Sequence, residues 1–467
     1  MDDILFSKLI NLVSNYNPDG VNTVKRAYYY AKYLHEGQYR QSGEPYIIHP
    51  LNVAYILAEY HADIDTLCAG LLHDVLEDCS DKTCDADITN MFNKNVINLV
   101  DGVTKMSKLN FSSKTEARDA NTRKIITGLT NDVRIIIIKL ADRIHNMRTI
   151  EFKSEYKQRE NAVETLEIFV PMAQFLGIYK MKNELEDLSF KYLDKDKYNL
   201  YEEKYLDIKN SSRDELTEVR DNLSEELSKH NIDNKATYRI KNIYGIYKRL
   251  SVSDNMESIH DLLAVKFAVP KVDDCYRSLG IIHSKYMPVN SKFKDYICNP
   301  KTNNYKSLHT TLFGPNDHLI QAQIRTFAMD RYNKYGIADY WISSPNDAGI
   351  IMQEKLRKYQ FYDSLIEIDN VFGNNDEFIS EVKDKLFSEK VYVYVMSGEI
   401  IEMPKGSTLN DFFRKVSFMP EIKGIRAVVN NDYVDDTYVL QDNDRIKVIT
   451  YEKDNELLKA KKLVKSI

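Results

Sequence analysis

The chain has 467 residues, which is too long for one ordinary core, so we expect two to four domains. Its composition, 43% hydrophobic and 29% charged, excludes a disordered or fibrous protein. No apolar run is long enough to predict a membrane span, and the acidic start of the chain does not resemble a signal peptide. Five scattered cysteines without a CxxC pair indicate reduced thiols and a cytoplasmic location. The net charge of −6 gives no overall basic field for nucleic-acid binding.

The first part of the chain is predicted to be helical and the middle part mixed. Apolar positions recur at helical spacing over residues 1–195. Residues 196–235 are highly charged, which favours an exposed pair of connecting helices. Residues 262–269 predict a buried strand, and residues 319–326 alternate strictly, as expected of a half-buried strand. Charged helix is predicted again over residues 346–387.

The C-terminal part has the pattern of a small β-grasp module. A strand at 391–395 is followed by a turn at Ser397–Gly398, a second strand, a helix that opens at Ser407 or Thr408, and two more strands. Together with the preceding regions, this order predicts a multidomain α+β protein. The predicted boundaries are 1–195 for an all-α domain, 196–345 for a mixed α/β domain, 346–387 for a helical linker, 388–450 for the β-grasp module and 451–467 for a tail.

A short motif in the helical region brings four ionisable side chains together. His73 and Asp74 are adjacent, and Glu77 and Asp78 follow one turn later. On a continuous helix, residues four apart share a face, so His73 would lie over Glu77 and Asp74 over Asp78. Such groups are costly to bury without a partner, and a divalent cation could be that partner. Imidazole and carboxylate ligands suit Mn²⁺, with Fe²⁺ or Zn²⁺ as alternatives.

Two further candidate ligands, His49 and Asp142, lie elsewhere in apolar surroundings. With His73 and Asp74 they would leave positions on the cation open for water and a phosphate oxygen, and the cation would activate that water. The two acids that are not needed as ligands could orient the water and move protons. The alternative is that the His-Asp pair is only part of a solvated helix face.

The residues around these side chains resemble a known family. Residues 35–58, 71–78, 99–109 and 138–149 resemble the hydrolase domain of long RelA/SpoT homologues. The resemblance implies an HD domain with (p)ppGpp 3′-pyrophosphohydrolase activity, with manganese held by the four ligands just named. It assigns catalysis to the two remaining acids, Glu77 and Asp78. The implied substrate-binding residues are Arg40, which would stack on guanine, Ser42, Asn146 and Thr149.

Basic and aromatic residues gather in the middle region of the chain. Arg239 and Lys241 stand two residues apart, and Asp261 immediately precedes the predicted strand at 262–269. Basic side chains neutralise phosphates, and an aromatic ring can stack on a base. A charged surface that contacts only solvent would also explain this composition. Further candidates for a nucleotide site are Lys294, Tyr305 and His309.

This region resembles the synthetase domain of the same family, which has a nucleotidyltransferase-like fold. That domain transfers pyrophosphate from ATP to the 3′-hydroxyl of GDP or GTP. The resemblance implies that Arg239 and Lys241 bind ATP phosphates and that Asp261 holds Mg²⁺ for catalysis. It further implies that Tyr305 stacks on guanine. The remaining residues that would line the site are Lys294, His309 and Arg325.

The synthetase-like region departs from the family pattern at Gln321. The family motif reads Glu-x-Gln-Ile-Arg-Thr, with glutamate as a Mg²⁺ ligand or general base, and Gln321 stands at its first position. On an alternating strand Gln321 shares a face with Gln323 and Arg325, so it should still point into the site. An amide cannot accept the hydroxyl proton, and loss of a general base typically costs about 10²- to 10⁴-fold in rate. Asp317 or Asp330 could supply a replacement carboxylate.

Residues 388–450 resemble the TGS domain of the family, which contacts tRNA on the ribosome. The expected partners are therefore guanine nucleotides and ATP, with the ribosome and uncharged tRNA as further candidates, and no membrane. Ser417 stands where the family has a histidine that contacts tRNA; Gln41 and Asn242 are other departures from family residues. The module could instead only steady the catalytic half. Long members continue into regulatory domains, so the chain is either naturally short or trimmed.

Three functional hypotheses follow. The first is an alarmone enzyme of the stringent response, with an intact hydrolase and a synthetase that is retained or attenuated. The second is a regulatory protein that binds nucleotide or ribosome and keeps only residual catalysis. The third is an HD hydrolase that acts on other nucleotides. Opposed activities in one chain would need a conformational switch, which we predict within residues 196–235.

Overall fold

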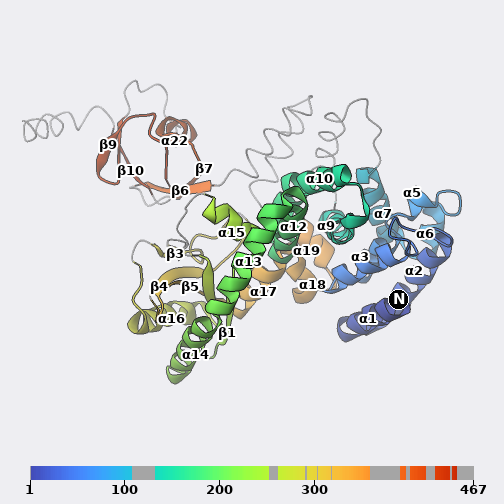
Figure 1. Ribbon diagram of the computed structural model, residues 1–467, viewed down its shortest axis with the longest axis horizontal. Helices are drawn as coiled ribbons and strands as arrows, with labels where there is room; N and C mark the ends of the chain where they lie inside the picture. Colours follow the sequence, from blue (N-terminus) through green and yellow to red (C-terminus); the bar gives the residue numbers. More distant parts are fainter. Residues whose placement is uncertain are drawn as a thin grey trace, which may run out of the picture. The chain divides into compact units, whose positions relative to one another are not determined.

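The computed structural model forms two compact units, Met1–Asn370 and Val371–Ile467, which are treated separately (Figure 1). In the described part of the chain, no helix is both long and apolar enough to cross a membrane. The described residues are 2–107, 132–251, 261–289, 292–301, 303–316, 318–357, 390–395, 400–416, 426–441 and 444–449.

The N-terminal region of the first unit is helical, as predicted. Its centre is α9, in which the apolar run Ile135–Ile138 is buried and packs against α3, α4 and α7. Pro50 falls in the first turn of α3, where its missing N–H group costs no helical hydrogen bond. The helices are α1 (Asp2–Tyr16), α2 (Val21–Leu34), α3 (Ile48–Ala58), α4 (Ile64–Leu72), α5 (Val75–Asp78), α6 (Asp85–Met91), α7 (Lys94–Ser107), α9 (Val133–Arg148), α10 (Glu155–Glu164), α11 (Val170–Phe175) and α12 (Tyr179–Leu193).

The His-Asp motif does not lie on one continuous helix, so this prediction was wrong. Helix α4 ends at Leu72, His73 caps its C-terminus, and Asp74 caps the N-terminus of the separate turn α5. The backbone N–H groups of Glu77 and Asp78 donate to the carbonyl oxygen of Asp74, which starts the new turn. As a result, both acids are exposed while His73 is buried.

The two helices after this region differ from the expected exposed connecting pair. They are α13 (Lys195–Ser211) and α14 (Arg213–Lys229). Helix α14 buries Leu216, Val219 and Leu223 in the core that covers the following sheet. A helix with such an apolar stripe belongs to the α/β core, and the prediction of an exposed α14 was wrong. The domain boundaries proposed above stay predictions.

The sheet of the first unit has the order β1-β2-β5-β4-β3, with β2 and β5 parallel and the other neighbours antiparallel. Strand β5 lies in the middle, and all its residues after Leu319 are buried, so the predicted half-buried strand is fully covered. The strands are β1 (Lys235–Ile240), β2 (Leu263–Val269), β3 (Lys294–Asp295), β4 (Leu308–Phe313) and β5 (Leu319–Thr326), and the helices are α15 (Ile243–Leu250), α16 (Val272–Lys285), α17 (Phe327–Tyr335), α18 (Tyr340–Ser343) and α19 (Ala348–Arg357).

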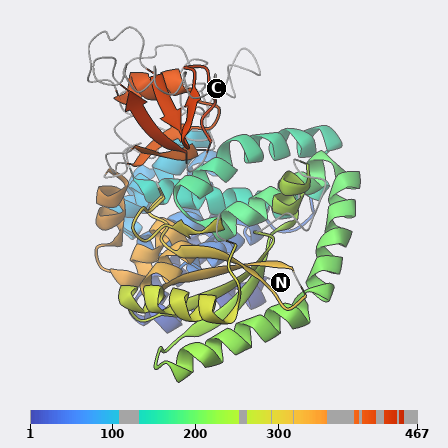
Figure 2. The same ribbon diagram turned by 90° about the vertical axis from the view of Figure 1, so that its left-hand side faces the viewer.

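The two faces of this sheet have different chemistry. Val265, Phe267 and Ile324 lie in the apolar core on the face covered by α14 and α16, and both views show these helices beside the strands (Figures 1 and 2). Because successive side chains alternate between faces, the intervening residues form a polar face. The strand register places Lys266 opposite Gln323. The described sheet therefore presents one apolar face and one face of cationic and amide groups.

The second unit has the expected two strands and helix, but three described strands follow the helix instead of the expected two, because the predicted strand after the helix forms two short strands, Arg426–Val429 and Asp432–Val434. Its sheet has the order β7-β6-β10-β8-β9, with β6 and β10 parallel, and Leu409 and Phe412 of its helix lie in its core. The predicted turn at Ser397–Gly398 and the tail 451–467 lie outside the described residues. The elements are β6 (Lys390–Val395), β7 (Ile400–Pro404), α22 (Leu409–Val416), β8 (Arg426–Val429), β9 (Asp432–Val434) and β10 (Arg445–Ile449).

Candidate functional site

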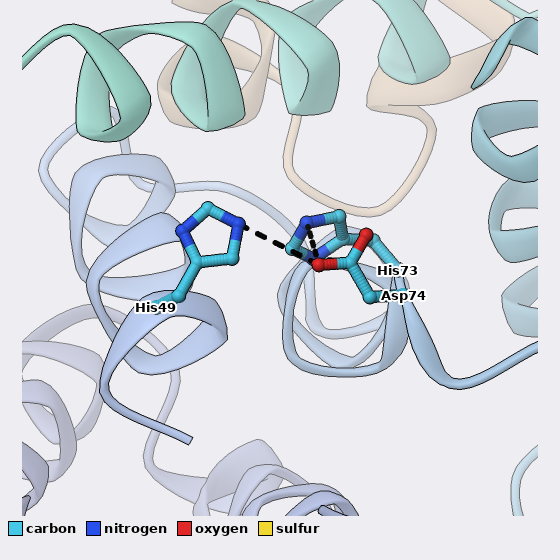
Figure 3. A group of neighbouring side chains, drawn as sticks. All are labelled: His49, His73 and Asp74. Atoms are coloured by element: carbon cyan, nitrogen blue, oxygen red, sulfur yellow. Dashed lines mark ion pairs between the residues drawn. The ribbon is translucent and has the colours of Figure 1, made fainter. Parts of the chain in front are cut away.

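The four expected metal ligands converge from three places in the helical region. His49 comes from the first turn of α3, His73 and Asp74 from the junction of α4 and α5, and Asp142 from α9. His49 Nε2 lies 3.3 Å from Asp142 Oδ1 and 3.6 Å from Asp74 Oδ2. His73 Nε2 lies 3.2 Å from Asp74 Oδ2 and 3.9 Å from Asp142 Oδ1. Figure 3 shows the side chain of His49 facing the side chains of His73 and Asp74.

The donor atoms fit a divalent cation. His73 Nδ1 bonds the carbonyl oxygen of Gly70 at 2.9 Å, so Nδ1 carries a proton and Nε2 is the nitrogen left for a cation. This Nε2 is buried and makes no hydrogen bond within the described part of the chain. Without a cation, His73 and Asp74 form a charged pair: burial opposes it, but Asp74 raises the pKa of His73 to about 9, and the protonated His73 in turn lowers the pKa of the Asp74 carboxyl. A divalent cation would take the place of the His73 Nε2 proton and leave Asp74 ionised. Two imidazole nitrogens with two carboxylates suit a first-row divalent metal.

Two residues outside the sequence predictions support the ligand carboxylates. Tyr46 Oη donates to Asp74 Oδ2 at 2.8 Å, and Lys139 Nζ donates to Asp142 Oδ2 at 2.8 Å. Each precedes a ligand by three residues: Tyr46 precedes His49, and Lys139 precedes Asp142. Lys139 and Asp142 both lie on α9, where residues three apart are neighbours, so a single charge in the apolar run was an available signal for Lys139. Tyr46 lies in the turn before α3, and no helical spacing predicts its contact with Asp74.

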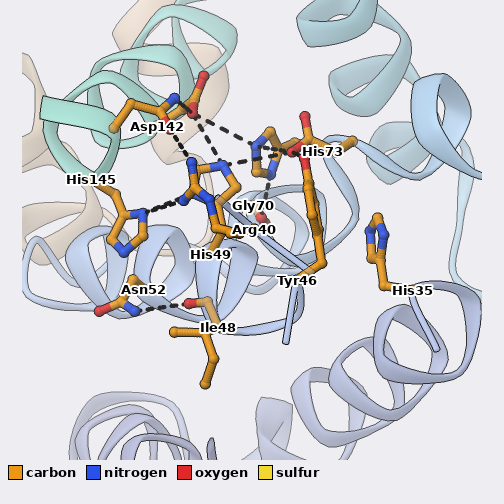
Figure 4. A network of polar contacts seen from close by, with 12 residues as sticks. His35, Arg40, Tyr46, Ile48, His49, Asn52, Gly70, His73, Asp142 and His145 are labelled. Carbon is orange, nitrogen blue, oxygen red and sulfur yellow. Dashed lines mark hydrogen bonds and ion pairs between the residues drawn. The ribbon is translucent and has the colours of Figure 1, made fainter. Parts of the chain in front are cut away.

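Arg40 is connected to two of the ligands through other side chains (Figure 4). Its Nη2 donates to Asn146 Oδ1 at 2.7 Å, and Asn146 Nδ2 donates to Asp142 Oδ1 at 2.6 Å. Its Nη1 lies 3.1 Å from His145 Nδ1, which is 2.8 Å from His49 Nδ1. Burial, then His49 and Arg40, lowers the pKa of His145 to about 2, so this imidazole is neutral. The sequence predictions missed His145.

A pocket beside these ligands collects several of the expected substrate-binding residues. Ser42 and Thr149 lie in its wall together with Arg40, and Asn146 is bonded to that arginine. Glu77 and Asp78 are exposed on α5, three and four residues after the candidate ligand Asp74. The pocket is therefore bounded by polar, cationic and aromatic groups, which suits a nucleotide. Its lining residues are Tyr39, Arg40, Gln41, Ser42, Tyr46, Thr149, Phe152 and Lys153.

In the sheet region, the expected Mg²⁺ ligand lies among cations. Arg239 is on β1, Lys241 follows that strand, and Asp261 precedes β2. Lys241 Nζ donates to Asp261 Oδ2, and Arg249 Nη2 donates to the same oxygen at 3.0 Å. Burial would raise the pKa of Asp261, but Lys241 and Arg249 bring it well below its usual range. One carboxylate oxygen is thus occupied by two cations, while Oδ1 has no hydrogen bond in the described structure.

The expected guanine-stacking tyrosine lies next to the expected histidine. Tyr305 Oη is 2.8 Å from His309 Nε2, and the Lys301 ammonium and Arg325 guanidinium lie 5.3 and 5.7 Å from the centre of the tyrosine ring. Burial and then Lys301 and Arg325 hold the pKa of His309 well below its usual value, so it is neutral. Lys294 on β3 pairs with His309 in the strand register. These residues therefore form one cationic and aromatic cluster.

Gln321 points along the polar face of β5, as predicted, and takes part in a hydrogen-bond chain. Arg325 Nη2 donates to Gln323 Oε1, and Gln323 Nε2 donates to Gln321 Oε1 at 2.6 Å. The amide oxygen of Gln321 is therefore occupied. Asp330 Oδ1 lies 3.8 Å from Arg325 Nη1, and its side chain is 43% exposed. Asp317 and Ser417 lie outside the described residues.

Lys266 is a member of the polar face that the sequence predictions missed. It is the one charged residue in the apolar strand β2, and it pairs with Gln323, which in turn pairs with His309 on β4. Burial first, and then Arg325 and Arg239, lowers the pKa of Lys266 to about 8. None of the described strands β1, β2, β4 and β5 contains an aspartate or glutamate. This face therefore suits phosphate groups, which carry negative charge.

Comparison with known proteins matches the three predicted regions to three families. The HD domain family matches residues 27–179, the "Region found in RelA / SpoT proteins" matches residues 238–346, and the ThiS family matches residues 386–451. The chain is 37% identical over 443 residues to a GTP pyrophosphokinase of Myxococcus xanthus, covering 94% of this chain and 58% of that protein.

Two other relatives agree with this assignment. The chain is 40% identical over 410 residues to the bifunctional (p)ppGpp synthase/hydrolase SpoT of Escherichia coli strain K12. It is 38% identical over 410 residues to a guanosine-3′,5′-bis(diphosphate) 3′-pyrophosphohydrolase of Vibrio cholerae. Each match covers 87% of this chain and 58% of the relative, so the chain spans little more than half the length of these proteins. The chain thus combines regions that match the HD domain family, the RelA/SpoT region and the ThiS family, and it is similar over most of its length to RelA/SpoT-type relatives.

Proposed function

We propose that this chain hydrolyses the 3′-diphosphate of (p)ppGpp and releases pyrophosphate and GDP or GTP. The observation that carries the proposal is the convergence of two imidazoles and two carboxylates beside a pocket that contains Arg40. Relatives named as (p)ppGpp hydrolases support the same substrate. The function belongs to alarmone metabolism in a cytoplasmic stringent response.

His49, His73, Asp74 and Asp142 would hold the cation, which we propose to be Mn²⁺. When bound, the cation supplies Lewis acidity and lowers the pKa of its water. In the proposed mechanism the guanidinium of Arg40 stacks on guanine, while Ser42, Asn146 and Thr149 bind polar groups of the nucleotide. Binding in this way orients the 3′-diphosphate toward the four ligands.

The two acids of α5 would handle the protons. Glu77 and Asp78 are exposed carboxylates one turn beyond the ligand Asp74. Either can accept a proton from the attacking water and return one to the leaving ribose 3′-oxygen, and exposure to solvent allows the carboxylate to be recharged between turnovers. The water oxygen forms the new bond to the 3′-phosphorus, and the bond from that phosphorus to the ribose 3′-oxygen breaks. Pyrophosphate therefore carries the water oxygen, and the nucleotide is left with a 3′-hydroxyl.

The test is pyrophosphate release from ppGpp by the purified chain and by an Asp74→Asn variant. The amide removes one anionic ligand, so we expect hydrolysis to fall by at least about 10²-fold. Asp81→Asn is the matched control, because Asp81 is exposed on the loop after α5. Unchanged hydrolysis by Asp74→Asn would show that the reaction takes place at another site. Equal turnover of ppGpp and dGTP would instead favour a general nucleotide hydrolase.

We further propose that the sheet region binds ATP and a guanine nucleotide, with Mg²⁺ at Asp261, and transfers pyrophosphate only weakly. The observation that favours weak transfer is the hydrogen-bond chain that occupies the oxygen of Gln321 on a face rich in cations. Arg239, Lys266 and Arg325 suit polyphosphate, but none of them accepts a proton from the attacking hydroxyl while protonated. Release of AMP from ATP, with and without GDP or GTP, tests this proposal.

The ribosome and uncharged tRNA stay predicted partners of the second unit. The ThiS-like match to residues 386–451 supports a binding module there. Co-sedimentation of the full chain with ribosomes, with and without uncharged tRNA in their A site, tests the prediction. If the chain stays in the supernatant in both cases, the prediction of ribosome binding is wrong, and the module only steadies the rest of the protein.

A further inference from the structure

His145 lies between a proposed metal ligand and the nucleotide pocket. It is a buried residue of α9, three positions after Asp142. Its Nδ1 is 2.8 Å from His49 Nδ1 and 3.1 Å from Arg40 Nη1. Figure 4 shows the imidazole of His145 directed toward both side chains. His145 lies within residues 138–149, which resemble the hydrolase domain, but the resemblance gave it no role, so its role has to be inferred from these contacts.

The contacts determine which nitrogen of each imidazole carries a proton. A guanidinium has only N–H donors, so the His145 Nδ1 that faces Arg40 must be the acceptor. His49 Nδ1 lies against the same acceptor and must therefore be the donor. In the neutral ring, the other nitrogen, Nε2 of His49, then has a free lone pair. That atom faces Asp74 and Asp142, where the cation would lie.

The second histidine ligand is arranged in the same way by a different partner. His73 Nδ1–H donates a hydrogen bond to the Gly70 carbonyl oxygen, and His73 Nε2 faces the acids. Hydrogen bonding of the nitrogen away from the metal commonly fixes the tautomer and orientation of a histidine ligand. His145 Nδ1 therefore accepts the hydrogen bond from His49 Nδ1, just as the Gly70 carbonyl oxygen accepts the one from His73 Nδ1.

Arg40 has a second connection to the ligands, through Asn146. The guanidinium donates to Asn146 Oδ1, and Asn146 Nδ2 donates to Asp142 Oδ1. Arg40 thus reaches His49 through His145 and Asp142 through Asn146. A displacement of His145 would disturb both the tautomer of His49 and the position of Arg40 at the pocket.

We propose that His145 is a positioning residue that holds His49 in the tautomer able to bind the cation and holds Arg40 at the nucleotide pocket. The proposal rests on the proposed hydrolase function of this site. It predicts that loss of the Nδ1 acceptor weakens cation binding even when no nucleotide is present. Because Arg40 shares that acceptor, the affinity for a guanine nucleotide falls as well.

The first experiment measures Mn²⁺ affinity of the full chain by electron paramagnetic resonance, without nucleotide. His145→Leu removes the acceptor, and we expect Mn²⁺ affinity to fall about 10- to 100-fold. His145→Asn places an amide oxygen near the position of Nδ1, so it should accept both donors and keep the affinity within about threefold. Asp74→Asn removes one of the four proposed ligands, so the Mn²⁺ that this variant no longer binds is the Mn²⁺ that the unmutated chain holds at this site. His283→Leu, which removes a half-buried histidine bonded to Thr310 on the sheet, is the matched control.

The outcomes separate this proposal from the proposed function. Equal Mn²⁺ affinity of His145→Leu and the unmutated chain overturns the positioning role, and so does an equal loss in the Leu and Asn variants, since a mere packing role predicts no rescue. Tight, His145-dependent Mn²⁺ binding without ppGpp hydrolysis leaves the proposal standing and overturns the function. Hydrolysis of ppGpp together with an Mn²⁺ affinity that does not depend on His145 supports the proposed function and overturns the positioning role.

A second measurement does not depend on folding of the Leu variant. The unmutated, metal-free chain is labelled with ¹⁵N-histidine, and long-range ¹H–¹⁵N correlation spectra assign the tautomer of each of its 10 histidines. We expect the proton on Nδ1 of His49 and on Nε2 of His145. The reverse arrangement at either residue contradicts the proposal.

Discussion

The helical site and the sheet site of the first unit carry opposite sets of ionisable groups. In the helical site, Asp74 and Asp142 face the imidazoles of His49 and His73. Two more acids, Glu77 and Asp78, follow on α5. In the sheet site, the described strands β1, β2, β4 and β5 contribute arginine, lysine and amide side chains but no acid. Asp261, at the edge of the sheet, is already paired with Lys241 and Arg249.

This difference indicates how the two proposed nucleotide sites would differ in the chemistry they support. Cations around a polyphosphate give binding and orientation, which both sites offer through arginine. A reaction also needs an acceptor for the proton of the attacking oxygen. Glu77 and Asp78 can supply that acceptor in the helical site, whereas Gln321 cannot supply it on the sheet.

The largest expected effect comes from restoring a carboxylate to the sheet. Gln321→Glu gives the attacking hydroxyl a proton acceptor, so we expect acceptor-dependent AMP release to rise about 10²- to 10⁴-fold. Quantification of AMP from ATP in the presence of GTP measures this change. Hydrolysis of ppGpp by the same variant serves as the control and should not change. A flat AMP signal would mean that the missing glutamate is not what limits transfer.

A smaller effect is expected from removing a support of the helical site. Tyr46→Phe deletes the hydroxyl that donates to Asp74 Oδ2. Loss of such an outer hydrogen bond typically costs about 10- to 100-fold in metal affinity. Titration of hydrolysis with Mn²⁺ should therefore shift to higher concentrations but approach the original rate at saturation. Tyr33→Phe, on the exposed face of α2, is the comparison variant, and an identical shift there would refute the assignment.

A pH effect of about tenfold is expected for nucleotide binding on the sheet. The pKa of Lys266 is lowered to about 8, so its ammonium is present below that pH and is lost above it. A charge-assisted hydrogen bond contributes about 1.5 kcal/mol, so GTP affinity should fall about tenfold as the pH rises from 7 to 9. Equilibrium binding of GTP to Lys266→Met should be weaker and nearly independent of pH in this range. Lys285→Met, on α16, should keep the original pH profile.

The meeting of the four candidate metal ligands was the feature of the helical site that the sequence predicted best, while their binding of a metal stays a proposal. Histidine and aspartate in apolar segments need partners, and the family resemblance identified which of them meet. The break between α4 and α5 could not be predicted, because the helical pattern continues through it. It accompanies long-range contacts, such as the hydrogen bond from Tyr46 to Asp74, that no local spacing encodes.

Two of the five described strands in the sheet of the first unit, β2 and β5, were predicted from the sequence; the burial of β2 was predicted correctly, but that of β5 was underestimated. Gln321, Gln323 and Arg325 look like the solvent side of an alternating strand, yet their side chains lie on a covered face and bond one another. Helix α14 was misjudged for a related reason, since its many charges concealed an apolar stripe. Lys266 and His145 were missed because their roles depend on residues distant in the sequence.

AMP release from ATP and Mg²⁺ by the unmutated chain, with and without GDP or GTP, tests the contrast between the two sites most directly. AMP reports pyrophosphate transfer even when the helical site destroys the product, and ppGpp hydrolysis measured in parallel shows that the preparation is active. We expect ppGpp hydrolysis together with AMP that barely exceeds the level without acceptor. Strong acceptor-dependent AMP would contradict the account and show that another group replaces the missing glutamate.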